Sequence, residues 1–231
     1  MPIKLGTTGF SSIYNGANNI ISVYKGTDLI FNKNNKNPLV QLIEKTIEVV
    51  DSTMWNESRV TDIRSSCFRY CSKLKRIKMP SALQNIGSYA FAGCSSLVNI
   101  ELPSKVSMID VCCFQDCTKL ETINIPEGVT TIWSSCFQNC ISLKDLTLPS
   151  SVTQLNDYAF QGCSSMKTLT LLSTSVVTLN TISGDTGALS IVSDETTIIY
   201  VPSSLVEQYK SDSRWSLYLT REKNPVTFVG I

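Results

Sequence analysis

The nine cysteines are the residues of this 231-residue chain with the most obvious chemistry, because the chain contains no histidine. Histidine is the commonest general base and the commonest side-chain ligand for metals. Its absence excludes Ser-His-Asp and Cys-His catalysis within the chain, and it excludes zinc sites of mixed cysteine and histidine ligands. The sequence therefore offers thiols without the partner that usually activates them.

Two series of cysteines follow one regular spacing. Five recur at a constant interval along the chain: Cys71, Cys94, Cys117, Cys140 and Cys163. A second series lies four residues earlier, with alanine in two copies: Cys67, Ala90, Cys113, Cys136 and Ala159. Because alanine replaces cysteine there, we expect both series to fill core positions. The C-x3-C pairs fit a zinc site only loosely, and disulfides between neighbouring copies are geometrically allowed but disfavoured in a cytoplasm.

Cys112 stands outside both series. Other copies have serine or tyrosine at its position, and these residues are buried less often than cysteine. We therefore expect Cys112 to point outward and to be the most reactive thiol.

Apolar residues recur at the same constant interval as the cysteines, which reveals an internal repeat. Five copies of the pattern V-x-x-I-x-x-x-[AC]-F-x-x-C-x-x-L-x-x-I-x-L-P begin at Val60, Leu83, Val106, Val129 and Val152. Each unit has an apolar edge that only stacking against its neighbours can bury, which is the physical basis of a solenoid. The I-x-L-P end predicts one short strand per unit, and stacking then gives a parallel sheet.

The repeat resembles the BspA-like class of leucine-rich repeats, as in IGSYAFAGCSSLVNIELP (86–103) and LNDYAFQGCSSMKTLTL (155–171). Residues 197–218 are similar to the segment that ends such arrays. The resemblance implies a binding or adhesion protein of a bacterial, phage or protist surface, with no catalytic residues and no cofactor. The first unit departs most from the pattern, because Tyr70 and basic residues replace Gly, Asp or Asn of later copies.

The N-terminal 36 residues carry a different repeat of ten residues, [IV]-x-x-G-[TA]-x-x-[FI]. It predicts short strands joined by glycine turns, and three copies are too few to fold well alone. The repeat is similar to short glycine repeats at the N-termini of tailed-phage structural proteins, and the candidate attachment residues are Tyr14, Gly16, Tyr24 and Gly26. A plain β-hairpin cap explains the same pattern.

These patterns divide the chain into four segments. They are an N-terminal β segment and candidate virion-attachment module (1–36), an N-terminal cap (37–59), five leucine-rich repeats (60–172), and a degenerate repeat with a C-terminal cap (173–231). The predicted fold class is a β-rich repeat solenoid with a parallel sheet, a small N-terminal β segment and a C-terminal α+β cap.

Each cap has its own predicted elements. In the N-terminal cap we expect a helix over 39–45, and a strand over 46–50 that covers the open end of the array. In the C-terminal cap we expect a strand at 196–201, a helix at 203–209, a core plug of Trp215, Leu217 and Leu219, and a last strand at 225–231.

Charge and hydropathy exclude several classes of partner. Lys and Arg number 20 and Asp and Glu number 19, so the net charge is +1. Such a chain is a poor candidate for binding nucleic acid or an anionic membrane by charge alone. The sequence shows no secretory signal and no apolar stretch of membrane-spanning length, so we expect a protein made in a cytoplasm without membrane insertion.

Two groups of residues are candidate interaction surfaces. The first is apolar and aromatic: Met108, Val111, Trp133, Tyr89 and Tyr158. Such a cluster marks an interface, unless a cap or a neighbouring loop folds over it. The second is a basic patch: Arg64, Arg69, Lys73, Lys75, Arg76 and Lys78. It fits either a solvated face or contact with an acidic partner or anionic glycan.

The outward strand positions form a mixed polar row that lacks an aromatic in the five units, which weakens the case for a sugar site. Its carboxylates Glu101 and Asp145 lie two units apart on an exposed sheet, so an enzyme is disfavoured. The leading hypothesis is a non-enzymatic phage virion protein, such as a tail or head fibre. Residues 1–36 attach it to other virion proteins, as a monomer or homo-oligomer, and the solenoid binds a host surface protein, a glycan or a neighbouring virion protein. The alternative is a cell-surface or secreted adhesin of a bacterium or protist.

Overall fold

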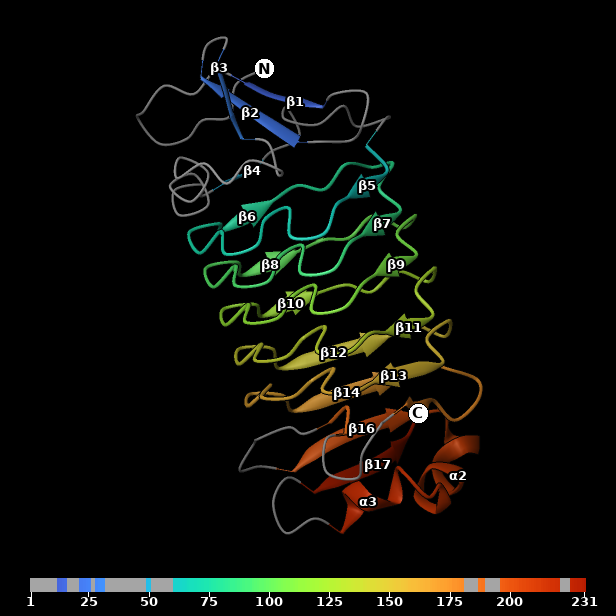
Figure 1. The fold of residues 1–231 in the computed structure, drawn as a ribbon. Coiled ribbons are helices and arrows are strands. Elements are labelled where there is room, and N and C mark those ends of the chain that lie inside the picture. The colour runs from blue at the N-terminus through green and yellow to red at the C-terminus, as the bar shows by residue number, and fades with distance from the viewer. Residues whose placement is uncertain are drawn as a thin grey trace.

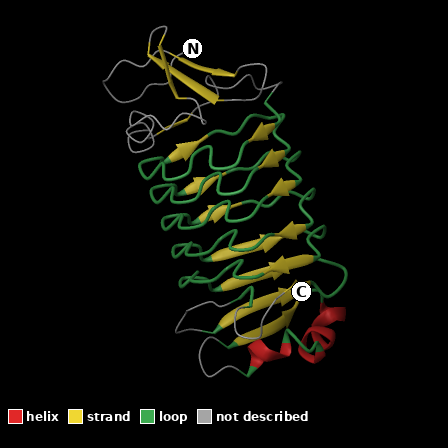
Figure 2. Ribbon diagram, viewed as in Figure 1, coloured by secondary structure: helices red, strands yellow, loops and turns green. Residues whose placement is uncertain are grey.

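Stacked repeat units form the body of the molecule, and the helices of the described residues lie at the C-terminal end (Figure 1, Figure 2). The computed structural model describes residues 12–15, 21–25, 28–31, 49–50, 60–180, 187–189, 196–220 and 225–231. The predicted β-rich solenoid with parallel strands and a helical C-terminal cap is confirmed. The helix expected over 39–45 lies outside the described residues.

Each unit contributes two short strands, where the sequence predicts one. The first ladder follows the I-x-L part of the repeat and contains β4 (Val49–Val50), β6 (Arg76–Ile77), β8 (Asn99–Ile100), β10 (Thr122–Ile123), β12 (Asp145–Leu148), β14 (Thr168–Leu171), β16 (Thr197–Val201) and β17 (Val226–Gly230). The second ladder follows the V-x-x-I part and contains β5 (Asp62–Ile63), β7 (Asn85–Ile86), β9 (Met108–Ile109), β11 (Thr131–Ile132), β13 (Gln154–Asn156) and β15 (Thr178–Asn180). The V-x-x-I spacing hides these strands, because it lacks the period of two that identifies a strand.

Paired strands of the two ladders are parallel, and their registers match the repeat. In the second ladder Ile63 lies opposite Ile86, and Ile86 lies opposite Ile109. In the first ladder Leu146 lies opposite Leu169. Equivalent residues therefore form buried columns along the solenoid, each next to its copy in the adjacent unit.

The turn between the two strands of each unit is bonded to the turn of the next unit. Its phenylalanines stack in one column with centroids 5.2 to 5.6 Å apart: Phe68, Phe91, Phe114, Phe137 and Phe160. Two residues of each turn have positive φ, and Gly93 (φ +75°) is one of them. An added Cβ on Gly93 would lie 2.6 Å from the Tyr70 ring. The repeat accordingly favours Gly, Asn or Asp here, residues that tolerate the left-handed region.

The cysteine column adds hydrogen bonds to its packing. Four of its thiols lie 3.1 to 3.2 Å from a phenylalanine carbonyl oxygen of the preceding unit, and the pairs are Cys94–Phe68, Cys117–Phe91, Cys140–Phe114 and Cys163–Phe137. All nine cysteines are buried thiols that form no disulfide. Packing is the role that the sequence predicts for the eight cysteines of the two repeat series, but the thiol donor is not apparent from the repeat pattern.

The N-terminal β segment contains an antiparallel three-stranded sheet of β1 (Ser12–Asn15), β2 (Ile21–Lys25) and β3 (Asp28–Phe31). Tyr14 lies in β1 and Tyr24 in β2, at the strand positions that the ten-residue repeat predicts. Gly16 and Gly26 lie outside the described residues.

The two ends of the solenoid are covered differently. β4 pairs in parallel with β6 at the N-terminal end, as the predicted covering strand requires. At the other end β17 pairs with β16, beside η2 (Ser203–Leu205), α2 (Val206–Ser211) and α3 (Ser216–Leu219). No helix among the described residues is long and apolar enough to cross a membrane.

The C-terminal core is centred on Trp215. Its indole nitrogen donates to the Val177 carbonyl oxygen at 2.7 Å, and its ring packs edge-on against Tyr209 at 5.3 Å. The predicted plug is wrong for Leu217, which is 55% exposed. Tyr218 is buried in its place, because adjacent residues of a helix point about 100° apart.

Candidate binding surfaces

Both ladders are interrupted between the third unit (106–128) and the fourth unit (129–151). In the first ladder β10 pairs with β8 and β12 pairs with β14. In the second, β9 pairs with β7 and β11 pairs with β13. Among the described strands, no pairing joins β10 to β12 or β9 to β11. The first ladder is also interrupted between β6 and β8, but β5 and β7 remain paired there.

The turns hold the third and fourth units together where the strands do not. The Phe114 N–H donates to the Cys136 carbonyl oxygen at 2.9 Å, and the Gln115 amide donates to Gln138 Oε1 at 2.9 Å. Because the turns are bonded and the strands are not, this boundary is open along its strands. We call it the unit 3–4 boundary. An apolar surface lies on its second ladder and a hollow lies on its first ladder.

The second ladder presents apolar side chains at the unit 3–4 boundary. Met108 on β9 is 46% exposed, and Trp133, directly after β11, is 38% exposed. Val111 and Tyr89 are half-buried, and the Tyr89 N–H donates to the Val111 carbonyl oxygen at 2.9 Å. We call these four residues the Trp133 surface. Tyr158, the fifth candidate, is half-buried in the next unit.

Cys112 is buried, so the expectation that it points outward is wrong. Only 7% of its surface is exposed, compared with 8% for Cys67. Its backbone has a φ of +55°, the left-handed region. Its side chain is close enough to Tyr89 to raise the pKa of the Tyr89 phenol. The position of Cys112 in the repeat determines its backbone conformation, but it does not determine whether the side chain is exposed to solvent.

Arg69 does not belong to the exposed basic patch. The other five members are exposed: Arg64, Lys73, Lys75, Arg76 and Lys78. The Arg69 guanidinium lies 4.8 Å from the Tyr70 ring centroid and 4.6 Å from the Tyr89 ring centroid, and its Nη2 donates to Tyr70 Oη at 3.0 Å. These cation–π contacts make Arg69 part of the packing between the first two units.

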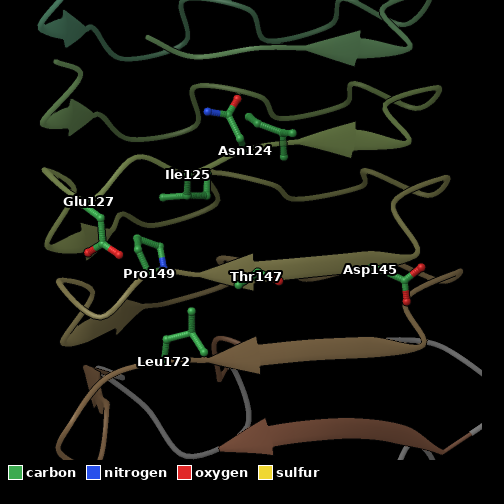
Figure 3. A pocket seen from close by; sticks show the side chains of 8 residues that line it. Asn124, Ile125, Glu127, Asp145, Thr147, Pro149 and Leu172 are labelled. Carbon is green, nitrogen blue, oxygen red and sulfur yellow. The ribbon is translucent and has the colours of Figure 1, made fainter. Parts of the chain in front are cut away.

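A hollow of about 460 Å³ opens between β10 and β12. Its lining residues are Ile123, Asn124, Ile125, Glu127, Asp145, Thr147, Pro149 and Leu172. Figure 3 shows Asp145 and Glu127 at opposite ends, with Thr147 between them. The volume lies in the range typical of small-molecule sites.

Asn124 lines this hollow, and its side chain is bonded to the preceding unit. Its Nδ2 donates to the Leu102 carbonyl oxygen at 2.8 Å, and its Oδ1 accepts from the Leu102 N–H at 2.7 Å. The Asn124 amide group thus pairs with the Leu102 backbone as a strand residue would. Leu102 follows β8, so these bonds lie on the side of β10 that faces away from β12. β10 ends at Ile123, whereas β12 and β14 pair over four residues.

An aromatic residue extends the outward row beside this hollow, and sequence reasoning missed it. Thr147 lies opposite Thr170, Thr170 opposite Tyr200, and Tyr200 opposite Val229. Tyr200 cannot be found by counting one repeat interval on from Thr170, because the sixth unit is longer than the earlier units. The local pattern Ile199-Tyr200-Val201-Pro202 repeats the I-x-L-P of earlier units and is the signal that would have identified it.

The buried thiols are poorly placed for chemistry. Burial raises the pKa of Cys163 to about 12, and it raises the pKa of Cys94 and Cys140 well above the usual thiol value. The thiolate is the reactive form, so these groups are inert in the folded chain. The described part of the chain contains no group of three or more Cys, Asp or Glu residues that could hold a metal ion.

Comparisons with known proteins agree with this architecture. A leucine-rich repeat protein of T. pallidum has 21% sequence identity and a TM-score of 0.55, over 100% of this chain and 99% of that chain. A leucine-rich repeat protein from Bacteroides ovatus has 20% identity and a TM-score of 0.51, over 87% of this chain and 60% of that one. None of the curated proteins matches. The family described as BspA type Leucine rich repeat region matches residues 52–181 in six copies, and this chain belongs to that family.

Proposed function

We propose that this chain is a non-enzymatic binding protein that acts in adhesion through the open unit 3–4 boundary. The observation that carries the proposal is that exposed apolar side chains and a hollow lie on the two ladders of one boundary. The hollow is a poor catalytic centre, because Asp145 and Glu127 stand at its opposite ends. General acid–base catalysis needs such groups within hydrogen-bond reach of one reacting atom.

The Trp133 surface is the proposed contact with a protein partner. Exposed tryptophan is costly to leave in water, and tryptophan is among the residues that contribute most when an interface forms. Met108 beside it is unbranched and adapts to an irregular partner surface. The partner would be a protein of a host surface.

Adhesion of beads coated with the whole chain tests this proposal. The beads are offered to intact gut bacteria and to animal epithelial cells. Trp133→Ala should lower bead retention at least tenfold, whereas Leu217→Ala, an exposed apolar residue on α3, should not change it. Beads that bind neither cell type would overturn the adhesion role, and equal retention of the two variants would exclude the Trp133 surface.

The finer proposal concerns the particle that carries the chain. We propose that residues 1–36 attach it to other proteins of a phage virion, as a tail or head fibre, with a cell-surface adhesin as the alternative. A sheet of three short strands is marginal alone, which favours a segment that needs a partner. A chain that starts at Asn37 should fold but no longer join particles. Incorporation of that shorter chain would refute the attachment role, and solution masses of both chains would show whether residues 1–36 form a homo-oligomer.

A further inference from the structure

The hollow between β10 and β12 has the chemistry of a sugar site. We propose that it binds a neutral oligosaccharide, with the Tyr200 ring as a platform for a second sugar beyond it. This inference rests on the proposed binding function and names the ligand class of one surface. The Trp133 surface lies on the other ladder, so the two surfaces can be tested separately.

The polar atoms that remain in the hollow are mainly hydrogen-bond acceptors. Asp145 Oδ1 accepts from Thr168 Oγ1 at 2.6 Å, and Glu127 Oε2 accepts from Ser150 Oγ at 3.1 Å. Each carboxylate thus uses one oxygen within the protein, and its second oxygen is left for a ligand. Ionised carboxylates only accept hydrogen bonds, so the ligand must supply donors. Sugar hydroxyl groups are such donors, and the Thr147 hydroxyl between the carboxylates can either donate or accept.

The charges around the hollow favour a neutral ligand. Lys144 and Lys167 are exposed, and they directly precede Asp145 and Thr168 in the chain. Both positive groups therefore belong to the Asp145 end of the hollow, where they offset the attraction of that carboxylate for a cation. An anionic glycan would meet both carboxylates, and a cationic peptide would gain little because exposed ion pairs contribute at most about 1 kcal/mol.

Apolar groups complete the surface that a sugar ring needs. Leu172 is 38% exposed at the end of the hollow near Glu127, whereas Ile123 and Ile125 are buried and contribute only the edges of their side chains to the lining. The C–H face of a pyranose ring packs on such groups and on aromatic rings. Tyr200 is two strands from Thr147 in the same row, which is about 10 Å at about 4.8 Å per strand. A ligand of two or more sugar rings therefore reaches from the hollow to the tyrosine.

Binding of the whole chain to printed glycans tests the inference. The array carries neutral, sialylated and sulfated oligosaccharides together with lysine-rich peptides. We expect neutral glycans to bind, and titration calorimetry with one of them should show fivefold to tenfold weaker binding for Thr147→Val and for Tyr200→Ala. Thr178→Val makes the same change at an exposed threonine of the second ladder and should leave the affinity unchanged. Circular dichroism of each variant checks that it is folded.

Several outcomes would overturn the inference. They are binding of acidic glycans alone, of lysine-rich peptides alone, of no probe, or of neutral glycans with equal affinity by all variants. Bead adhesion to cells stripped of surface glycans distinguishes a failure of this inference from a failure of the adhesion role. Beads that still adhere to such cells, and that lose adhesion with Trp133→Ala, would leave the binding function in place without a sugar site.

Discussion

Alkaline pH should destabilise this fold steeply, because its buried thiols cannot ionise without unfolding. Burial is the first cause that raises the pKa of six cysteines: Cys94, Cys113, Cys117, Cys136, Cys140 and Cys163. All six are fully buried among apolar side chains of the two core columns. Each keeps its proton in the folded chain at a pH where an exposed thiol has lost it.

The sign and size of the effect follow from linkage. Above a pKa of about 8.5 the unfolded chain binds fewer thiol protons than the folded chain, so the free energy of unfolding falls as pH rises. The stabilisation is complete below about pH 8 and is lost progressively toward the raised folded pKa, about 12 for Cys163. Each thiol costs about 1 kcal/mol at pH 9 and about 2 kcal/mol at pH 10, so six cost about 12 kcal/mol at pH 10. That loss is comparable with the whole stability of a typical domain, which is about 5 to 15 kcal/mol.

Urea unfolding at pH 7, 8, 9 and 10 in a phosphine reductant measures this loss. Tyrosine and lysine also titrate near pH 10, so the parent chain is compared with the double variant Cys113→Ala/Cys136→Ala. Alanine occupies the same position naturally at Ala90 and Ala159, so the fold accepts it. Between pH 7 and pH 10 the double variant should lose about 4 kcal/mol less than the parent. Equal losses for both chains would refute the reasoning.

Two further predictions concern the turn. Phe114→Ala should cost about 4 to 6 kcal/mol, because it removes a fully buried ring and two stacking contacts at 5.4 and 5.6 Å, whereas Phe114→Leu should cost less than half of that in the same urea assay. Leucine restores most of the buried volume but neither stacking contact, so similar costs for the two variants would contradict a main contribution from buried volume. In the native chain, iodoacetamide should label Cys67 and Cys112 before the other seven cysteines, because these two are 8% and 7% exposed and the rest at most 2%. Mass spectrometry of the peptides reads the order, and earlier labelling of a column cysteine would count against it.

The stacked fold is predictable because every unit repeats the same residue types at the same positions. The regular step of Phe91, Phe114 and Phe137 fixes which face is inward, and the stacked rings follow. The second ladder is not predictable in this way, since V-x-x-I lacks the period of a strand. The interruption at the unit 3–4 boundary is hidden for another reason. It depends on whether the backbone groups of neighbouring strands meet at hydrogen-bond distance, and the residue types of the repeat do not determine that.

Some residues of the candidate surfaces are predictable from the sequence and others are not. Trp133 is found as a departure from a repeat position that holds polar residues or glycine elsewhere, and it is exposed. The same argument fails for Cys112, because the left-handed backbone at that position is compatible with a buried side chain. Tyr200 is not found by comparing equivalent repeat positions, because that comparison needs a constant repeat length and the sixth unit is longer.

The regular units explain how one irregular boundary can be both open and well defined. Turn hydrogen bonds across the unit 3–4 boundary, such as Asp116 N–H to the Gln138 carbonyl oxygen at 2.8 Å, fix the distance between the two units. Paired strands on each side, β8 with β10 and β12 with β14, fix the direction of the rims. The opening therefore needs no inserted loop or lid. Side chains on its rims are held by the solenoid before any partner arrives, which lowers the entropy cost of binding.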